Sequence, residues 1–466
     1  MDIDPKIFKA YDIRGIYPTD LDEAKGAQIA KAIYTFFQKK LNKDQITVAL
    51  GWDMRVSSPS MVESVRKALL EAGAHVVNLG LVSTPTFYFA VSHFGYETGI
   101  TVTASHNPKE YTGMKFVINT PKGLLKIGKP TGMEDVRDLA LQGVNPPKKE
   151  GTEEDQSDIT QAEVQNALNL LGNPTLKQFK IVADPANAMG IPYLNALASK
   201  LPIDLVKMNF DLDGTFPVHQ PDPMQPKNLV YAQKKLQEVN ADLGLVPDGD
   251  GDRLFILDEK GDVVSPSVIT SMIAKELFKE FPKSKVVVDA KYSLTVKKNV
   301  EAWGGEVLIS KTGHAFITEL MTNSGALMAG EASAHYYYNA TGNAESQVIT
   351  IIAVMKILTE ENKPLSEVAK EYQSAFESGE INFAVTNAQE IMDHIKSTYH
   401  DGEFSDLDGV IISYPDWRMS LRTSNTEPLL RFNLEALTRD TMEQKRDEVI
   451  SLIKSVAKED VSHASH

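Results

Sequence analysis

A chain of 466 residues is too long for one ordinary hydrophobic core and predicts roughly three or four domains of about 100–150 residues. Its net charge of −15 argues against a nucleic-acid partner, because such binding requires a basic surface. The chain contains no cysteine, no signal-peptide pattern and no apolar run of about 20 residues, so disulfides and thiolate metal sites are excluded and a cytoplasmic protein with no membrane partner is expected.

The first three-quarters of the chain repeats one plan three times. Each copy opens with an apolar strand that ends in an aspartate, at Asp53, Asp184 and Asp289. A helix-like segment follows, as in 60–73 and 268–281, and then come a second strand and a third strand that ends in a polar loop. Apolar strands that alternate with helices are typical of mostly parallel α/β sheets, in which ligands bind beyond the carboxyl ends of the strands.

The remainder of the chain predicts a smaller α+β module, with a helix over 366–375, strands within 410–424 and 429–437 and a closing helix over 442–457. The predicted fold class is therefore α/β, with three similar mixed α/β modules followed by one smaller α+β domain. The polar segment 150–158 is interpreted as a linker. The predicted domains are 1–150, 151–256, 257–365 and 366–466.

Ser105 stands at the end of the strand-like run GITVTA. A serine hydroxyl is a weak nucleophile unless neighbours activate it or it already carries the group to be transferred. His106 and Lys115 are close in sequence, and the turn at 107–108 directs the hydroxyl outward. On these residues alone, a serine turn without chemistry is an equally good interpretation. The chain lacks a G-x-S-x-G elbow here, which argues against an α/β-hydrolase.

Asp248, Asp250 and Asp252 alternate with glycines in the sequence PDGDGDR. Three such carboxylates can turn inward on one hard cation, which favours magnesium or calcium over zinc. One alternative is an Asp/Gly turn without metal. A second is an EF-hand, because Glu259 falls at the twelfth position of the loop, but Arg253 takes the place of the glycine that the sharp turn of an EF-hand needs. The EF-hand is therefore rejected.

The remaining polar loops carry weaker signals. The loop 331–335 offers a carboxylate, a hydroxyl and an imidazole, which suit sugar hydroxyls, and 422–426 offers donors that are typical of a phosphate site. An arginine and a tyrosine stand beside a glycine in 9–15. Lys291 and His314 are candidate general acids or bases. Each of these features is explained at least as well by a structural role when it is taken alone.

Taken together, the motifs resemble the α-D-phosphohexomutase superfamily, and in particular its phosphomannomutase/phosphoglucomutase branch. They follow one another in the family order and span nearly the whole chain. The matching motifs are KAYDIRG (9–15), TASHNP (103–108), DGDGDR (248–253), KTGH (311–314), GEASAH (330–335) and RTSNTEP (422–428).

The resemblance implies four domains around a large central cleft, a phosphoserine at Ser105, one Mg²⁺ per chain and a hexose 1,6-bisphosphate intermediate. It also assigns roles by residue match. The metal ligands are Ser105, Asp248, Asp250 and Asp252. The catalytic positions are Ser105, His106, Lys115, Arg14, Lys291 and His314. The substrate-binding positions are Tyr11, Arg253, Glu331, Ser333, His335, Arg422, Ser424, Asn425, Thr426 and Arg431.

Two departures from the family pattern concern sugar recognition. Ala332 and Ala334 replace the usual Met and Gly of the sugar loop, and 343–346 lacks the usual acidic residue followed by glycine. If the second of these alanines has a positive φ, it costs about 1 kcal/mol relative to glycine.

The expected activity is the interconversion of hexose 1-phosphate and hexose 6-phosphate, with mannose and glucose both accepted, by a monomer or homodimer. A phosphoglucosamine mutase is one rival reading, although its usual Gly-Thr-Asp-Gly-Ile-Arg-Gly-like start differs from 9–15. A phosphatase, in which water attacks the phosphoserine, is another. A non-catalytic sugar-phosphate sensor is a third, and the retained Ser105 and aspartates argue against it.

Overall fold

The computed structural model describes residues 3–144, 150–423 and 429–458. The chain divides into two compact units. The first unit comprises Met1–Val264, Met321–Met328 and Ser333–Val368, and the second comprises Ser265–Leu320, Ala329–Ala332 and Ala369–His466.

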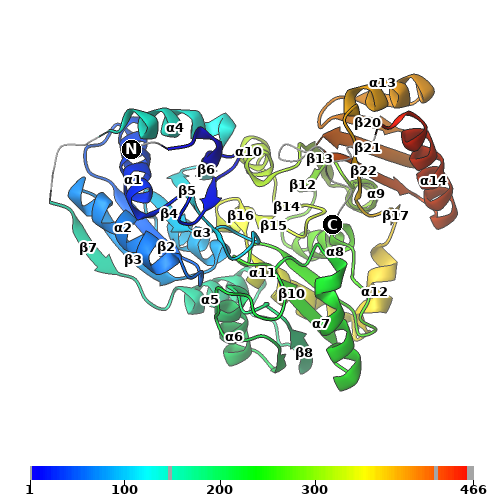
Figure 1. Cartoon of the computed structure of the whole chain (residues 1–466). Coiled ribbons are helices and arrows are strands. Elements are labelled where there is room, and N and C mark those ends of the chain that lie inside the picture. The colour runs from blue at the N-terminus through cyan, green and yellow to red at the C-terminus, as the bar shows by residue number, and fades with distance from the viewer. Residues whose placement is uncertain (1–2, 145–149, 424–428, 459–466) are drawn as a thin grey trace. The chain divides into compact units, whose positions relative to one another are not determined.

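The first unit opens with a sheet of seven strands: β1 (Ile13–Ile16), β2 (Thr47–Trp52), β3 (His75–Leu81), β4 (Thr98–Val102), β5 (Tyr111–Thr120), β6 (Gly123–Lys126) and β7 (Thr152–Asp155). The strand order is β1-β5-β4-β2-β3-β7, and β6 pairs with β5 (Figure 1). Strands β4, β2, β3 and β7 run parallel, whereas β5 pairs antiparallel with β4, β1 and β6.

Four helices cover this sheet: α1 (Glu23–Leu41), α2 (Ser58–Glu71), α3 (Thr84–His93) and α4 (Met133–Gln142). Successive residues of a strand point to opposite faces. Val48 and Leu50 of β2 therefore join the core cluster of α1, α2 and α4, whereas Ala49 joins the cluster of α3. Both faces of the sheet are buried, which explains the continuous apolar runs in the sequence.

The second sheet has the order β11-β10-β8-β9. Its strands are β8 (Phe179–Ala183), β9 (Ile203–Lys207), β10 (Leu243–Pro247) and β11 (Leu254–Leu257), and only β11 is antiparallel to its neighbour. The first unit also contains α5 (Ile159–Leu170), α6 (Gly190–Lys200), α7 (Pro226–Val239), β15 (Tyr336–Tyr338), β16 (Ala344–Glu345), α11 (Gln347–Glu361) and the 3-10 helices Pro5–Ile7, Lys129–Thr131 and Asn339–Thr341.

The second unit contains a parallel pair and an antiparallel sheet. Strands β12 (Lys285–Asp289) and β13 (Glu306–Ser310) pair in parallel beside α8 (Pro266–Leu277) and α9 (Leu294–Ala302). The antiparallel sheet comprises β17 (Phe376–Glu377), β18 (Ile381–Ala384), β19 (Glu403–Ser405), β20 (Val410–Ser413), β21 (Trp417–Thr423) and β22 (Leu429–Ala436), with α13 (Ala388–Thr398) and α14 (Arg439–Val456). The elements α10 (His314–Ser324), β14 (Met328–Gly330) and α12 (Leu365–Tyr372) contain residues of both units.

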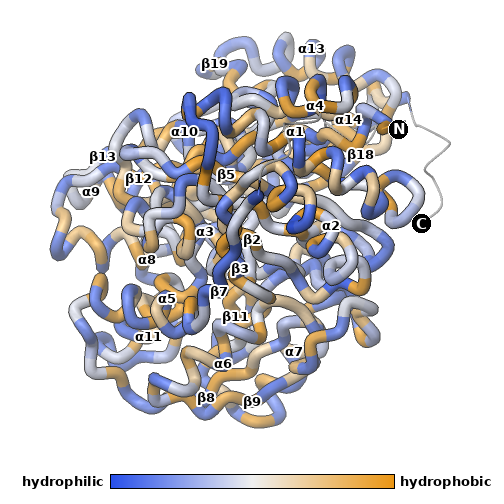
Figure 2. The backbone as a smooth tube through the Cα atoms, turned by 90° about the vertical axis from the view of Figure 1, so that its left-hand side faces the viewer, coloured by the Kyte–Doolittle hydropathy of each residue, from blue (hydrophilic) through white to orange (hydrophobic). Residues whose placement is uncertain are grey.

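The predicted linker at 150–158 is wrong for its central residues. Thr152–Asp155 forms strand β7, which pairs in parallel with β3 at the edge of the first sheet. All four side chains of β7 are exposed, and Figure 2 colours the segment hydrophilic. An edge strand that is held through its backbone needs no apolar face, so the composition gave no strand signal.

The α/β fold class is confirmed, with three α/β domains and a smaller C-terminal α+β domain. The predicted domain boundaries and the central cleft stay predictions. Over the part of the chain that the structure describes, none of the helices combines the length and the apolar character needed to cross a bilayer.

Candidate active site

Ser105 lies in a tight loop just beyond the carboxyl end of β4. Its φ of 53° is in the left-handed region, which a residue with a side chain rarely adopts. The main-chain N–H of Ser105 donates to Thr103 Oγ1 at 3.1 Å, and its Oγ lies 3.0 Å from His106 Nδ1. Ser105 is also buried. These contacts and the burial together fix the direction in which the hydroxyl points.

Arg55, a residue that the sequence motifs did not single out, holds this loop from behind. It follows β2 and is 1% exposed, and its Nε lies 3.2 Å from Asp53 Oδ2. A guanidinium has five donors in a rigid fork and can therefore bind several acceptors at once. Its Nη1 and Nη2 donate at 2.7–3.1 Å to the main-chain carbonyls of Ser105, Asn107, Pro108 and Tyr111.

Asp248, Asp250 and Asp252 lie beyond the carboxyl end of β10, as the sequence predicted. All three are buried, and they offer ligand oxygens within 4.8 Å of one another. The glycines between them allow the loop to turn. Gly251 has a φ of 77°, and a Cβ at Gly249 would clash with the carbonyl oxygen of Ser105. The aspartate loop therefore packs directly against the serine loop.

The polar contacts of these carboxylates fit a bound cation. Asp250 Oδ2 accepts hydrogen bonds from Thr84 Oγ1 and Lys115 Nζ, both at 2.6 Å, and Asp252 Oδ2 accepts one from the same ammonium at 2.7 Å. Among the described residues, Asp248 Oδ2 and Asp250 Oδ1 have no hydrogen-bond partner although they are buried. Buried carboxylate oxygens without a hydrogen bond are costly unless a cation binds them, and carboxylate oxygens are the ligands that Mg²⁺ prefers.

The electrostatics of the site separate these groups. Burial, together with Asp252 and Asp250, raises the pKa of Asp248, whereas Lys115 and His335 outweigh burial and lower the pKa of Asp252. Burial alone would lower the pKa of Lys115, but Asp250 and Asp252 raise it well above its ordinary value. Lys115 is therefore a fixed cation.

His106 has the opposite protonation preference. Its removal from water, together with the charges of Arg253 and Arg14, lowers its pKa well below the ordinary value. The imidazole next to Ser105 Oγ is therefore neutral at pH 7 and can exchange a proton with the hydroxyl.

Two predicted arginines border the same loops. Arg14 pairs with Asp12 at 2.7 Å and donates to the Asn107 side chain. Arg253 donates its main-chain N–H to Asp248 Oδ1 at 3.1 Å, and its Nε lies 3.8 Å from Asp248 Oδ2. Tyr11 lies in the bend before β1 and is half-buried.

Ser333 and His335 contact the aspartate loop. His335 Nδ1 lies 2.8 Å from Ser333 Oγ, and its Nε2 lies 3.1 Å from Asp252 Oδ1. Ala334 between them has a φ of 64° and is fully buried, and its carbonyl accepts from Leu254 N at 2.9 Å. The positive φ on which the expected strain of Ala334 depends is therefore present, and the strain is about 1 kcal/mol.

The remaining predicted residues lie in the second unit. Lys291 follows β12, and its Nζ lies 3.8 Å from Asp289 Oδ2. Glu331 is buried and accepts from Gly313 N at 3.0 Å, next to His314 at the start of α10. This arrangement connects the motifs KTGH and GEASAH.

The predicted phosphate loop is described only at its edges. Arg422 and Arg431 are directly opposite on β21 and β22, and both lie near Glu380, at 3.8 and 3.2 Å. Ser424, Asn425 and Thr426 lie outside the described residues.

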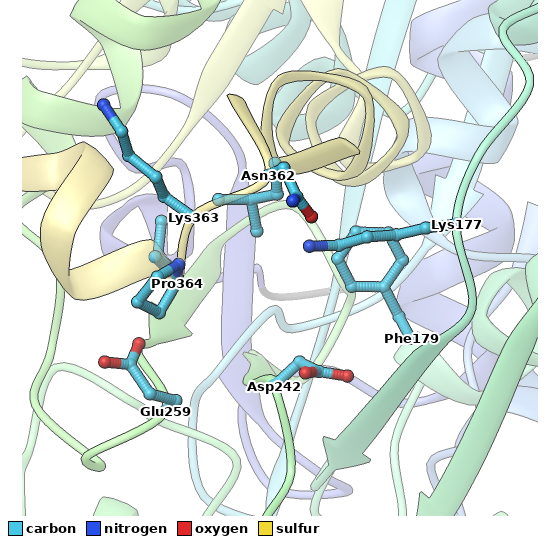
Figure 3. Close-up of a pocket in the computed structure, with 9 residues that line it drawn as sticks. Lys177, Phe179, Asp242, Glu259, Asn362, Lys363 and Pro364 are labelled. Carbon is cyan, nitrogen blue, oxygen red and sulfur yellow. The ribbon is translucent and has the colours of Figure 1, made fainter. Parts of the chain in front are cut away.

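A hollow in the first unit does not belong to this site (Figure 3). It is lined by Lys177, Phe179, Asp242, Glu259 and the segment 362–365, together with Leu358. Figure 3 shows the side chains of Lys177 and Asn362 pointing toward each other across it. Phe179 and Asp242 lie at the amino ends of β8 and β10, at the opposite end of these strands from the aspartate loop.

Family models match four successive parts of the chain. They are described as phosphoglucomutase/phosphomannomutase alpha/beta/alpha domains I, II and III and the C-terminal domain of the same proteins. The matches cover residues 5–126, 162–261, 265–376 and 380–452.

Relatives match over nearly the whole chain. A phosphomannomutase of Methanocaldococcus jannaschii is 36% identical over 453 residues, which are 97% of this chain and 98% of the relative. A phosphomannomutase of Salmonella montevideo is 33% identical over 459 residues, covering 96% and 99%. A solved structure of a phosphoglucomutase/phosphomannomutase family protein from Burkholderia thailandensis has a TM-score of 0.86 at 28% identity and covers 98% of this chain and 99% of that chain.

Proposed function

Because this chain belongs to the phosphoglucomutase/phosphomannomutase family and is a phosphohexomutase, an intramolecular phosphotransferase, we propose that Ser105 carries the phosphoryl group that it transfers. The observation that carries this proposal is the juxtaposition of a buried serine hydroxyl in a left-handed turn with three buried aspartates, two of whose oxygens accept no hydrogen bond from the described residues. The proposed substrates are the 1- and 6-phosphates of mannose and glucose.

The proposed metal is one Mg²⁺ per chain, held by Asp248, Asp250, Asp252 and the phosphate on Ser105. When bound, it supplies positive charge to the phosphoryl oxygens during transfer. Lys115 donates hydrogen bonds to two of the same carboxylates. Its raised pKa keeps it positively charged, so it supplies positive charge and does not act as a base. We propose that Lys115, Arg14 and Arg253 stabilise the transferring phosphoryl group electrostatically.

The proposed transfer is balanced in atoms and protons. The bond between phosphorus and Ser105 Oγ breaks while a bond forms between phosphorus and a sugar hydroxyl, whose proton passes to a general base. Lys291 and His314 are the candidates for that base. His106, neutral and 3.0 Å from Oγ, is placed to accept the Ser105 hydroxyl proton when the serine is rephosphorylated, and the imidazolium returns that proton to Oγ when the bond to phosphorus next breaks. The hexose 1,6-bisphosphate then returns its other phosphoryl group to Ser105 by the reverse step.

Substrate binding is proposed for the remaining predicted residues. Glu331 supplies a carboxylate for sugar hydroxyls, and Arg422 and Arg431 supply guanidinium groups for the phosphate that is not transferred. The contact of His335 with Asp252 supports a role in orienting a metal ligand in addition to its predicted contact with substrate. Tyr11, Ser333, Ser424, Asn425 and Thr426 keep the substrate-binding roles predicted from the sequence.

The proposal is tested with the Ser105→Ala variant, with Ser60→Ala as an exposed-serine control. Isomerised sugar phosphate and released phosphate are measured side by side, without added bisphosphate, on mannose 1-phosphate and glucose 1-phosphate. We expect the wild type to carry one phosphoryl group on Ser105 by peptide mass spectrometry and Ser105→Ala to lose isomerisation. Wild-type turnover by Ser105→Ala would refute the carrier, and release of phosphate without isomerisation would favour a phosphatase.

A phosphoglucosamine mutase has less support, because the relatives named above are phosphomannomutases. The domain boundaries, the monomeric or dimeric state and the cytoplasmic location stay predictions.

A further inference from the structure

The turn that carries Lys291 is held by two residues to which no role has been assigned, Arg418 and Glu435. They lie directly opposite each other on β21 and β22, and Arg418 Nη1 donates to Glu435 Oε1 at 2.8 Å. Both side chains are buried, at 5% and 0% exposure. The antiparallel register of the two strands therefore places Arg418 and Glu435 side by side, in the position from which both contact the turn.

Arg418 binds the carbonyl side of the turn. Its Nη2 donates to the carbonyl of Ala290 at 2.9 Å, and its Nη1 donates to the carbonyl of Lys291 itself at 3.3 Å. Because the guanidinium is planar and its donors are fixed in a fork, these two bonds set the orientation of the peptide groups as well as their position.

Glu435 binds the amide side of the same turn. Its Oε1 accepts from Ser293 N at 2.7 Å and its Oε2 from Leu294 N at 3.0 Å. These are the first amides of α9, which has no side-chain cap from its own Ser293. The carboxylate of Glu435 therefore caps α9 from a strand about 140 residues away, at the end of the helix where its dipole favours a negative charge.

Asp289 completes the frame from the strand side. Its Oδ1 accepts from Lys291 N at 3.0 Å and its Oδ2 from Ala332 N at 3.1 Å. The N–H and the carbonyl of Lys291 are thus both bound to buried side chains. The side chain of Lys291 is buried as well, and its position follows from a main chain that is fixed on both sides.

We infer that Arg418 and Glu435 are positioning residues for phosphoryl transfer, which act through Lys291 by fixing the turn 290–294. The inference rests on the general acid–base role proposed for Lys291. A buried ion pair is weak evidence for stability, since desolvation offsets most of its attraction. The pair instead fixes the orientation of the turn, because it makes four hydrogen bonds to main-chain groups of this one turn. A displacement of about 1 Å in a catalytic group can cost about 100-fold in rate.

The test compares Glu435→Gln and Arg418→Met with Leu434→Ala. Glutamine places an amide donor against one of the two amides that Glu435 accepts from, and methionine removes both bonds to the carbonyls. Leu434 is buried on the opposite face of the same strand, so its truncation destabilises the sheet without touching the turn. Arg418→Lys is a milder variant that keeps the charge. Kinetics with mannose 1-phosphate are measured well below the melting temperature of each variant.

We expect Glu435→Gln and Arg418→Met to lower kcat at least about tenfold with KM changed by less than about threefold, and Leu434→Ala to lower only the melting temperature. If both residues act through Lys291, Glu435→Gln adds less than about a threefold loss to the Lys291→Met enzyme.

Two results would overturn the inference while the proposed function stands. One is a loss of kcat in Glu435→Gln and Arg418→Met no greater than in Leu434→Ala. The other is a loss that multiplies fully with that of Lys291→Met. Unchanged kcat in Lys291→Met alone would instead refute the acid–base role of Lys291, and the inference with it.

Discussion

Two pairs of buried carboxylates, one pair in each unit, are compensated in different ways. In the second unit, each oxygen of Asp289 and of Glu435 accepts a main-chain N–H, so these groups act as caps. In the first unit, Asp248 Oδ2 and Asp250 Oδ1 have no hydrogen-bond partner among the described residues. The carboxylates of Asp289 and Glu435 hold the backbone in place, whereas those of Asp248 and Asp250 leave negative charge available for a cation.

The largest effect is expected when one of the aspartates of the first unit is changed. Asp250→Asn removes one negative charge while the shape of the loop is kept, so Mg²⁺ binding weakens and kcat/KM falls by at least about 100-fold. In the wild type, Mg²⁺ raises the melting temperature by mass action, and this rise disappears in the variant. Thermal melts with EDTA and with excess Mg²⁺ measure both states.

Asp289→Asn is the matched control for that experiment. The amide has one acceptor oxygen fewer, so a main-chain hydrogen bond is lost and stability falls by roughly 1–3 kcal/mol. Its melting temperature still rises with Mg²⁺. Equal responses of the two variants to Mg²⁺ would show that the comparison between the two units is wrong.

The next effect concerns Arg55, which holds the loop of Ser105 in place. Arg55 binds four carbonyls of the Ser105 loop with a counter-charge only two residues away, at Asp53. Arg55→Lys keeps the charge but has no rigid fork, so we expect kcat to fall about 10–100-fold with KM little changed. Arg66→Met removes an arginine of helix α2 whose ion pairs are partly exposed, and it is expected to be near neutral. Wild-type kcat in Arg55→Lys would show that charge alone holds the loop.

The sequence was sufficient to predict the strands that carry the site. Its apolar runs end at Asp53, Asp184 and Asp289, within one residue of the ends of β2, β8 and β12. These strands are buried on both faces, and burial is what apolar runs report. Strand β7 was missed because an edge strand with four exposed polar side chains carries no such pattern.

The supporting residues of the site were harder to predict. Arg55 stands two residues after a strand-end aspartate, and that position was a usable signal, but its four acceptors are main-chain carbonyls some 50 residues away. Arg418 and Glu435 likewise bind backbone atoms. Main-chain groups have no residue-specific signature, so contacts to them follow only from the folded chain. The motif residues were predicted because their side chains bear the chemistry.

A third kind of buried carboxyl keeps its proton below about pH 7, and its effect is on stability. Glu163 is 1% exposed and accepts one hydrogen bond, from Thr86, and burial raises its pKa to about 7. The folded state therefore holds the proton more tightly than the unfolded state, whose glutamates have a pKa of about 4.3. Stability is greatest below the unfolded pKa and falls as pH rises toward 7, by about 4 kcal/mol in all at 1.36 kcal/mol per pKa unit.

Glu163→Gln cannot ionise and should lose none of this stability. The difference in melting temperature between this variant and the wild type is therefore expected to shift in favour of the variant as pH rises from 5 to 8. Glu153→Gln, on the exposed strand β7 and paired with an arginine that does not titrate in this range, is the control and should show a flat difference. A flat difference for Glu163→Gln as well would mean that Glu163 ionises in the fold at little cost.

The smallest effect is expected at Ala334. Replacing Ala334 by glycine and replacing Ala332 by glycine should change the stability in opposite directions. Ala334 has a φ of 64°, whereas Ala332 does not adopt a positive φ. Glycine at 334 removes a left-handed strain of about 1 kcal/mol and adds about 0.4–1 kcal/mol of unfolded-chain entropy, so stability should rise by at most about 0.5 kcal/mol. Glycine at 332 adds only the entropy and should lower stability by about 0.4–1 kcal/mol.

The same pair of variants tests whether this strain tunes sugar choice. The carbonyl of Ala334 is bonded to Leu254 N, and His335 is bonded to Asp252, so glycine at 334 should leave the loop in place. The ratio of kcat/KM for mannose 1-phosphate to that for glucose 1-phosphate is then expected to change less than about threefold, since no hydroxyl contact is gained or lost. A larger change in Ala334→Gly, absent in Ala332→Gly, would mean that the strained alanine sets the positions of Glu331 and Ser333 against the sugar.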